Sequence, residues 1–332
     1  MRKTVVASFA IVLLAACSQD TGNSDDSDFY QGKTISYIVA TDPGGGYDSY
    51  ARLIGGYLQK YMPIDNVVIK NTPGAGHLVG ANTLHRSKPN GLTIGTFNIG
   101  LIYGQLLGKA GMAFDLRDLA WVGKAAGEPR SIVVSNNCVI QSIDDLIAAE
   151  EPVKFGSAGL GSASWSDMML LADALELKVE IVPGFEGNEG EMSMMRGEIC
   201  AIMGSTSSFK NFLDSGYGHL ILTVGGEIEG VPNAVDVART DRAKRLVAIV
   251  DALAKLGRIT AAPPGTPPAR LEALRAAYKA SLEDPQLRAE AARLGLPIDP
   301  AYGEEVEQLV IGALDQTPET VAMIKKAIDG TE

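Results

Sequence analysis

The glycine run at residues 44–46 joins an apolar, strand-like segment to an amphipathic segment of helical period. Glycine tolerates positive φ and has no Cβ to keep a ligand away from the backbone. The unpaired N–H groups in the first turn of a helix attract carboxylate or phosphate. The sequence therefore predicts an anion-binding turn here. Asp48, close to the helix start, has two open interpretations: it caps and orders the turn, or it contacts a ligand hydroxyl or ammonium group.

Other turns rich in glycine or serine also follow strand-like segments. One of them contains Ser157, Gly159, Gly161 and Ser162, so that hydroxyl groups add to open backbone at the start of a helix. For Ser162, helix capping and ligand binding are compatible interpretations. A cleft lined by several such helix starts would bind an anion. The remaining turns of this kind lie at residues 72–80, 184–187 and 204–206.

The turn at residues 74–80 has a GxGxxxG spacing that is similar to a dinucleotide-binding fingerprint. That fingerprint requires an acidic residue at the end of the next strand to hold a ribose, whereas here the next strand ends at Asn98. We therefore interpret this turn as close helix–sheet packing. A nucleotide-dependent α/β enzyme stays as a rival hypothesis.

Residues that could catalyse a reaction are sparse. His77, His85 and His219 are the three histidines, and neither His77 nor His85 has an evident serine or cysteine partner in the sequence. The chain contains no nucleophile elbow, P-loop, HExxH or EF-hand spacing. The sequence thus favours a binding protein over an enzyme, and it predicts neither a cofactor nor a metal site.

The first residues are typical of an export signal. A basic start precedes a short apolar run, and the sequence LAAC ending at Cys17 matches a bacterial lipobox. We predict a lipoprotein signal peptide at 1–17, with Cys17 as the lipidated residue; an ordinary signal with a chance cysteine is the alternative. Residues 18–32 are polar and without period, which predicts a flexible tether. These features indicate a protein of the cell envelope, periplasmic or otherwise extracytoplasmic, anchored to a membrane by lipid.

The charge balance argues against a nucleic-acid partner. The chain has 29 basic and 40 acidic residues, for a net charge of −11, and removal of Arg2 and Lys3 with the signal leaves −13. A small anionic ligand stays compatible with this charge, since local backbone donors can outweigh the global field. Beyond Cys17, the two other cysteines are Cys138 and Cys200, which in an oxidising compartment either pair or stay as two buried thiols.

The elements that must position these turns alternate along the chain. Helical stretches separate many short runs of apolar, β-branched residues, which predict buried strands. These runs lie near residues 35–40, 66–70, 92–97, 131–135, 153–157, 179–183, 199–204 and 219–224. Such alternation predicts an α/β fold with parallel sheets and helices on their faces. Ligands of these sheets bind at the carboxyl ends of the strands. From residue 236 onward the sequence predicts mostly helix.

Several motifs together resemble one family. PGGGYDSYAR, NTPGAGHLVGAN, KPNGLTIGTFN, KFGSAGLGSAS and PGFEGNEGEM occur in the order and at the spacing of the extracytoplasmic solute receptors of tripartite tricarboxylate transporters, the TctC or Bug-type proteins. The C-terminal segment from residue 262 also resembles that family. Two departures are the bulky Tyr47 after the glycines and a loosely matching tract at 225–237.

The resemblance implies a two-lobed, type II periplasmic-binding-protein-like fold, with hinge strands and a central ligand cleft. Lobe 1 would comprise residues 33–130 plus 226–332, and lobe 2 residues 131–225. It also implies a monomer that captures a small carboxylate, such as a di- or tricarboxylate or an aromatic acid, for integral-membrane transporter subunits. A carboxylate receptor that signals to a membrane sensor is the alternative within the same family.

The resemblance further implies which residues bind the ligand. One wall of the cleft would come from the glycine turn and the end of a later strand, and the other from the serine–glycine turn and two later loops. The residues so implied are Gly45, Gly46, Tyr47, Asp48, Asn98, Ser157, Gly159, Gly161, Ser162, Phe185, Glu186, Gly187 and Ser205.

Overall fold

A computed structural model describes residues 28–185 and 188–329 of the chain. The predicted signal peptide with Cys17, and the predicted ligand residues Glu186 and Gly187, lie outside the described residues. The predicted tether, 18–32, overlaps a folded turn, because the Tyr30 side chain is buried and its hydroxyl donates to backbone carbonyls of Gly91 and Arg270. Within the described ranges, no helix has the length and apolar character that a membrane span requires.

The first lobe is built on a six-stranded sheet with the strand order β11-β4-β10-β3-β1-β2. β1 lies parallel to β2 and β3, whereas β10 runs antiparallel to β3 and β4. The strands are β1 (Thr34–Val39), β2 (Asn66–Asn71), β3 (Thr93–Thr96), β4 (Ala120–Lys124), β10 (Ile259–Ala262) and β11 (Ala301–Tyr302). The helices that follow or cover them are α1 (Gly46–Tyr61), α2 (Leu78–His85), α3 (Gly100–Leu106), α10 (Pro268–Glu283), α11 (Pro285–Leu294), α12 (Glu304–Leu314) and α13 (Pro318–Asp329), with a 3-10 turn η1 (Leu116–Asp118).

The second lobe has a five-stranded sheet with the order β7-β6-β8-β5-β9. β6 pairs in parallel with β7 and β8, and β5 runs antiparallel to β8 and β9. Its strands are β5 (Arg130–Ser135), β6 (Val153–Ser157), β7 (Val179–Pro183), β8 (Ala201–Ser205) and β9 (Gly218–Val224). Its helices are α4 (Ile143–Ala148), α5 (Ala163–Leu175), α6 (Glu189–Arg196), α7 (Lys210–Asp214), α8 (Ala234–Val237) and α9 (Asp241–Ala254), with a 3-10 turn η2 (Thr206–Phe209).

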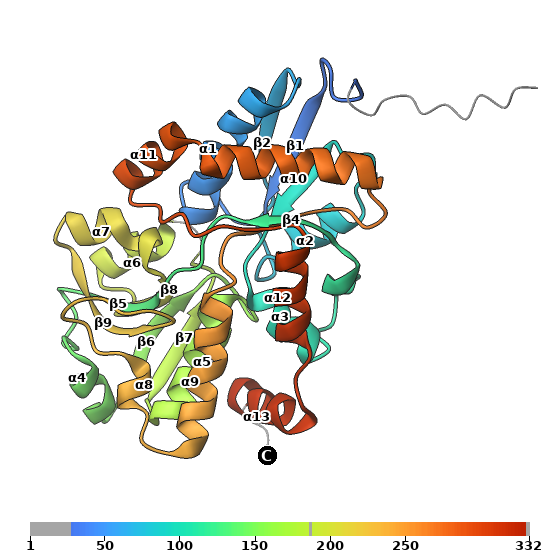
Figure 1. Cartoon of the computed structure of the whole chain (residues 1–332). Helices are drawn as coiled ribbons and strands as arrows, with labels where there is room; N and C mark the ends of the chain where they lie inside the picture. Colours follow the sequence, from blue (N-terminus) through green and yellow to red (C-terminus); the bar gives the residue numbers. More distant parts are fainter. Residues whose placement is uncertain (1–27, 186–187, 330–332) are drawn as a thin grey trace, which may run out of the picture.

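Two sheets with helices on their faces make a two-lobed α/β protein, which confirms the predicted fold class (Figure 1). Both sheets are mixed rather than purely parallel. In the first sheet β10 and β11 run opposite to the other strands, and in the second sheet β5 does so. The chain crosses between the sheets through residues 125–129 and returns through residues 255–258.

Helix α9 bears on where the lobes divide. It packs against α5 and β9 of the second sheet, whereas the family resemblance implies that residues 226–332 belong to lobe 1. Figure 1 shows α5 and α9 side by side, with α13 to the right of the lower part of α9, and α13 also packs against α5. We therefore propose that residues 234–254 belong to lobe 2, and the other lobe boundaries implied by the resemblance stay predictions.

Helix α1 shows how the sequence builds a wall of the cleft. Its apolar residues recur at helical spacing and bury one face of the helix against the sheet. On that face Gly55 lets the helix lie close to β2, since a Cβ there would stand 3.1 Å from Val67 Cγ1. The helix begins at Gly46, directly after β1 and the glycine run, so its first turn lies at the carboxyl end of the sheet.

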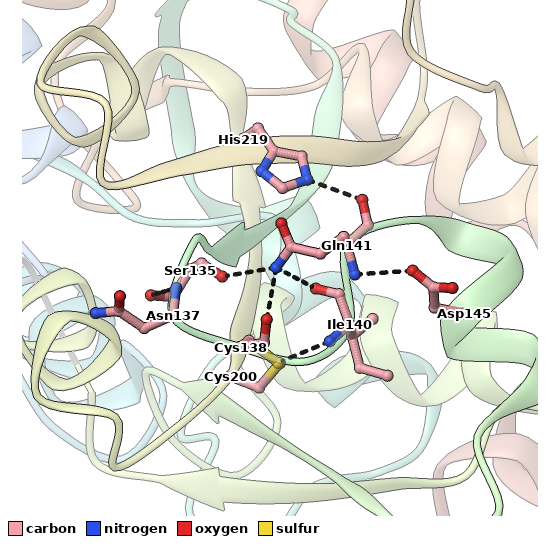
Figure 2. Close-up of a disulfide and its surroundings, with 8 residues drawn as sticks. All are labelled: Ser135, Asn137, Cys138, Ile140, Gln141, Asp145, Cys200 and His219. Carbon is pink, nitrogen blue, oxygen red and sulfur yellow. Dashed lines mark hydrogen bonds between the residues drawn. A yellow bond between two sulfur atoms is a disulfide. The ribbon is translucent and has the colours of Figure 1, made fainter.

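The structure pairs Cys138 with Cys200, which answers the question that the sequence left open (Figure 2). The bond ties the turn after β5 to the residue before β8. The side-chain amide of Gln141 supports the same turn by donating to the carbonyls of Cys138 and Ile140, at 2.6 and 3.1 Å. His219 on β9 also holds it, through a ring nitrogen 2.8 Å from the Gln141 carbonyl oxygen.

Replacement of both Cys138 and Cys200 by serine should lower the free energy of unfolding. The bond closes a loop with a sequence separation of 62 residues, and a loop of that size stabilises the folded state by about 2–5 kcal/mol through the entropy of the unfolded chain. Urea unfolding of both proteins measures the difference. An unchanged midpoint in the double variant would show that the bond contributes nothing to stability.

Candidate ligand-binding site

A cavity of about 120 Å³ lies between the lobes, at the carboxyl ends of strands from both sheets. The first lobe provides Thr41, Gly45, Gly46, Tyr47, His77 and Asn98. The second lobe provides Arg130, Ala158, Ala163, Ser164, Phe185, Glu191, Ile202, Gly204, Ser205, Ser208 and Phe209, and Arg258 comes from the returning crossover. A larger hollow of about 570 Å³ lies beside the disulfide, but its lining is mainly apolar. The smaller cavity is the candidate site because charged groups and open backbone converge on it.

The glycine turn reaches the cavity with little to obstruct it. Gly44 has φ of 91°, a conformation that favours glycine. Gly45 is the N-cap of α1, and because glycine has no side chain, no N-cap side chain covers the first turn of the helix. A Cβ on Gly46 would stand 2.6 Å from Ser208 Oγ and 2.7 Å from Arg258 Nη2, so only glycine lets these groups approach the start of α1. The first N–H groups of the helix thus lie beside the cavity.

Asp48 orders the glycine turn and does not line the cavity. Its Oδ2 accepts from the Gly44 N–H at 3.0 Å and from Arg52 Nε at 2.8 Å, and its Oδ1 accepts from Asn71 Nδ2 at 3.1 Å. Burial alone would raise the pKa of Asp48, but these hydrogen bonds lower it below its usual value. Of the two interpretations from sequence, the structure gives Asp48 the turn-ordering role.

Arg130 brings a buried positive charge to the second wall. Its Nε contacts Oδ2 of Asp167, whose side chain has no exposed surface, and the Tyr103 hydroxyl donates to the other oxygen at 2.8 Å. Burial raises the pKa of Asp167, whereas the guanidinium and the tyrosine hydroxyl oppose that rise. Arg130 Nη1 also lies 3.4 Å from Ser205 Oγ. Arginine stays charged in proteins, so this contact is an ion pair.

Arg258 supplies a second buried guanidinium, paired with Glu128. Its Nε and Nη2 donate to Oε1 of Glu128 at 3.1 and 2.8 Å, and both side chains are 2% exposed. Nη2 also donates to the Ser208 hydroxyl at 3.1 Å, and the guanidinium lies 4.4 Å from the centre of the Tyr47 ring. Arg258 therefore contacts elements of both lobes. Each cavity arginine carries its own buried counter-ion.

His77 lines the cavity in its neutral form. It precedes α2 with φ of 76° and packs edge-to-face against Tyr47, with ring centres 5.9 Å apart. Burial, with nearby positive charges, lowers the pKa of His77 to about 3. Its Nδ1 is buried without a hydrogen-bond partner among the described residues. The imidazole thus offers the cavity a neutral polar group.

The predicted ligand residues divide into two groups. Gly45, Gly46, Tyr47, Asn98, Phe185 and Ser205 line the cavity. The serine–glycine turn does not, except through its neighbours Ala158, Ala163 and Ser164. Ser162 caps α5 by accepting from the Trp165 N–H at 3.3 Å and donates to the Gly159 carbonyl at 2.7 Å. Ser157 has no exposed surface.

The serine–glycine turn instead packs on the turn at residues 74–80 of the first lobe. A Cβ on Gly76 would stand 2.8 Å from the Leu160 carbonyl oxygen, and one on Gly159 would stand 3.2 Å from the Gly76 nitrogen. Gly161 faces Lys109, whose Nζ donates to the Leu160 carbonyl at 2.6 Å. These contacts form a seam between the lobes next to the cavity.

Sequence reasoning missed His77, Arg130 and Arg258 as cavity residues. One local signal could have indicated that Arg130 is functional: it is a charged residue at the start of the otherwise apolar strand RSIVVS, and charged residues are seldom buried unless they are paired. Within the described ranges, no cluster of metal-binding side chains is present.

Two lobes around a polar cavity define the class of two-lobed solute-binding proteins. The family described as the tripartite tricarboxylate transporter family receptor matches residues 51–327, and the chain belongs to this family. The chain is similar, at 26% identity over 90% of its length and 88% of the relative, to the Agrobacterium vitis "UPF0065 protein in the TAR-I ttuE-ttuC' intergenic region".

Solved structures share the fold. The periplasmic binding protein BugD superposes with a TM-score of 0.75 at 19% identity, covering 90% of this chain and 98% of that chain. The R. palustris protein Rpa4515, solved with adipate, superposes with a TM-score of 0.74 at 17% identity, covering 88% of this chain and 97% of the other. These likenesses confirm the two-lobed arrangement.

The Gly46→Ala variant should bind ligand at least tenfold more weakly, because the new methyl group collides with Ser208 and Arg258 and forces the two walls apart. Gly56→Ala on the same helix is the matched control, since a Cβ there meets nothing within 4 Å. Calorimetric titration with the carboxylate that a thermal-shift screen identifies measures both variants. Equal affinities would place the ligand away from the start of α1.

Proposed function

We propose that this protein captures a small carboxylate in the cavity between its lobes and delivers it to a tripartite-tricarboxylate-type membrane transporter. The proposal is based mainly on the small cavity between the lobes. The open first turn of α1 lies on one side of it, and polar groups of the other lobe lie on the opposite side. A helix N-terminus attracts a carboxylate through its free N–H groups and its dipole.

The paired arginines fit a receptor that must also release its ligand. A guanidinium without a counter-ion would hold a carboxylate strongly in a buried site. Here Asp167 and Glu128 already neutralise Arg130 and Arg258, so these side chains donate hydrogen bonds without adding net charge. Binding then depends mainly on hydrogen bonds to a charged acceptor, each contributing about 1.5–3 kcal/mol.

Asn98 is proposed as a direct donor to the ligand. Its Oδ1 accepts from the Gly100 N–H at 2.9 Å, which fixes the amide orientation. In the described part of the chain, no hydrogen bond engages its Nδ2, and the residue lines the cavity. The amide N–H groups are therefore available to a carboxylate oxygen.

The packing of the second glycine turn supports binding over nucleotide-dependent catalysis. A Cβ on Gly80 would stand 2.5 Å from Ala40 Cβ and 2.9 Å from the Thr72 carbonyl oxygen. The GxGxxxG spacing thus serves close contact between α2 and β1. This leaves the 74–80 turn with a packing role in the proposed receptor.

Family membership supports the remaining parts of the proposal. We infer that the mature protein is an extracytoplasmic monomer, tethered to a membrane by lipid on Cys17, and that integral-membrane transporter subunits receive its ligand. A tethered receptor needs no free diffusion to reach its transporter, since a short linker raises the effective concentration of the two partners.

A thermal-shift screen tests the proposed function. The panel contains mono-, di- and tricarboxylates, hydroxy acids and aromatic acids, together with NAD and ATP. A ligand that binds only the folded state raises apparent stability by about 2.7 kcal/mol at 100 times its dissociation constant. The proposal requires stabilisation by at least one carboxylate. Stabilisation by a nucleotide alone would support the enzyme hypothesis instead.

Asn98→Asp should weaken carboxylate binding at least tenfold. The substitution keeps the oxygen that accepts from Gly100 but replaces the amide donor with a negative charge facing the ligand. Asn137→Asp, on the exposed turn near the disulfide, adds the same charge outside the cavity and should leave affinity unchanged. Calorimetry at fixed ionic strength compares the two variants. Similar affinity in both would remove Asn98 from the site.

Cys17→Ser should release the protein from the membrane, since the thiol that accepts the lipid is lost. Fractionation of cells and the mass of the mature protein measure the change. A variant that stays with the membrane at the parent's mature mass would show that lipid on Cys17 is not the anchor.

A further inference from the structure

Glu191 is the only acidic residue among the described residues that line the ligand cavity. It lies in the first turns of α6, on the second lobe. It also lines a polar hollow of about 330 Å³ that adjoins the cavity, and Gly46 and Ser208 are shared by the two. Glu191 therefore stands where a ligand longer than the cavity would pass into the hollow.

Glu191 and Arg293 are the charged side chains lining the cavity and the hollow for which no ion pair is found among the described residues. On the cavity side, Arg130 and Arg258 are each neutralised by a carboxylate behind the wall. On the side of the hollow, Lys210 pairs with Asp214, and Arg293 lies on the lining. In the described part of the chain, no hydrogen bond or ion pair is found for the Glu191 carboxyl group, which is partly buried.

An ionised Glu191 would repel the second carboxylate of a dicarboxylate whose first carboxylate occupies the start of α1. A protonated Glu191 would instead donate its O–H to that second carboxylate, with a proton taken from solvent. We propose that Glu191 is a specificity-determining residue that binds the distal carboxylate of a dicarboxylate with uptake of one proton. This inference rests on the proposed function, because it assumes that a carboxylate occupies the cavity.

The titration behaviour of the site is consistent with this role. Burial raises the pKa of Glu191 to about 7. Histidine is the residue type that normally titrates between pH 5 and 8, but burial lowers the pKa of His77, the histidine facing this cavity, to about 3. Among the described residues that line the cavity, Glu191 is thus the group whose raised pKa brings its change of charge close to neutral pH.

Affinity for adipate, measured by calorimetry between pH 6 and pH 8, tests the proposal. The first carboxyl group of adipate resembles a free glutamate side chain, with pKa about 4.3, and its charge makes the second a weaker acid, so adipate is mainly a dianion at pH 6 and fully a dianion at pH 8. If only protein with protonated Glu191 binds adipate, affinity falls about tenfold from pH 6 to pH 8, in proportion to the competent fraction. Hexanoate, which has one carboxylate on the same chain, should show no such fall.

Two variants assign the effect to Glu191. Glu191→Gln keeps a donor at this position without a titrating proton, so its affinity for adipate should be independent of pH and close to the parent's value at pH 6. Glu180→Gln makes the same charge change on the exposed face of β7 and should keep the parent's pH dependence. Titrations in buffers of different ionisation enthalpy should show about half a proton taken up per adipate at pH 7 by the parent and none by Glu191→Gln.

Each contrary result has a distinct meaning. An adipate affinity that is flat or rises with pH, or that keeps its slope in Glu191→Gln, overturns the role of Glu191. Binding of monocarboxylates without binding of adipate also overturns it, while leaving the proposed function intact. If no carboxylate of the thermal-shift panel stabilises the protein, the proposed function fails, and this inference fails with it.

Discussion

The buried ion pair between Arg258 and Glu128 is the interaction on which the cleft depends. Both residues lie on the crossover segments, next to the hydroxyls of Ser207 and Ser208 from lobe 2 and the ring of Tyr47 from lobe 1. Removing two charges from water costs several kcal/mol per ion, and only good geometry and further hydrogen bonds offset that cost. The guanidinium meets this demand by donating to Glu128 and to the two serine hydroxyls of lobe 2 while it lies over the Tyr47 ring of lobe 1, so the pair helps to fix where the two cavity walls stand.

A constrained backbone accompanies this pair. Arg258 has φ of 58°, a conformation that non-glycine residues seldom adopt and that costs about 1–3 kcal/mol. The positive φ lies just before β10, where the chain turns back into the first sheet. Gly46, at the start of α1, makes room for the same side chain, because it has no Cβ that would collide with the guanidinium. Glycine at position 46 is thus required for the contact of α1 with Arg258 as well as for the proposed approach of the ligand.

Local sequence patterns predicted much of the fold, and the family resemblance implied six of the eighteen residues that line the candidate site. Runs such as VKFGS and HLILTV are apolar and β-branched, and they form β6 and β9. β10 was missed because ITAA is short and lies inside a mostly helical region. The glycine turn was predicted from its flexibility and position. Ser162 caps its own helix, one of the two roles that the sequence allowed, and it does not line the cavity.

The charged part of the site could not be predicted from local pattern. Glu128 and Arg258 are 130 residues apart in the sequence, and Arg130 meets Asp167 only after β5 and α5 pack together. Pairing of this kind depends on the tertiary structure, so no spacing rule reveals it. The family resemblance did not name these residues either, because it was carried by glycine and serine motifs.

The central claim is that a carboxylate lies between the lobes at the start of α1. A crystal structure of the protein with adipate tests it most directly. We predict that a carboxylate contacts the backbone N–H groups after Gly45 and the side chain of Asn98. Adipate in the apolar hollow beside Cys138 and Cys200, with the inter-lobe cavity holding only water, would show that the start of α1 does not bind the ligand.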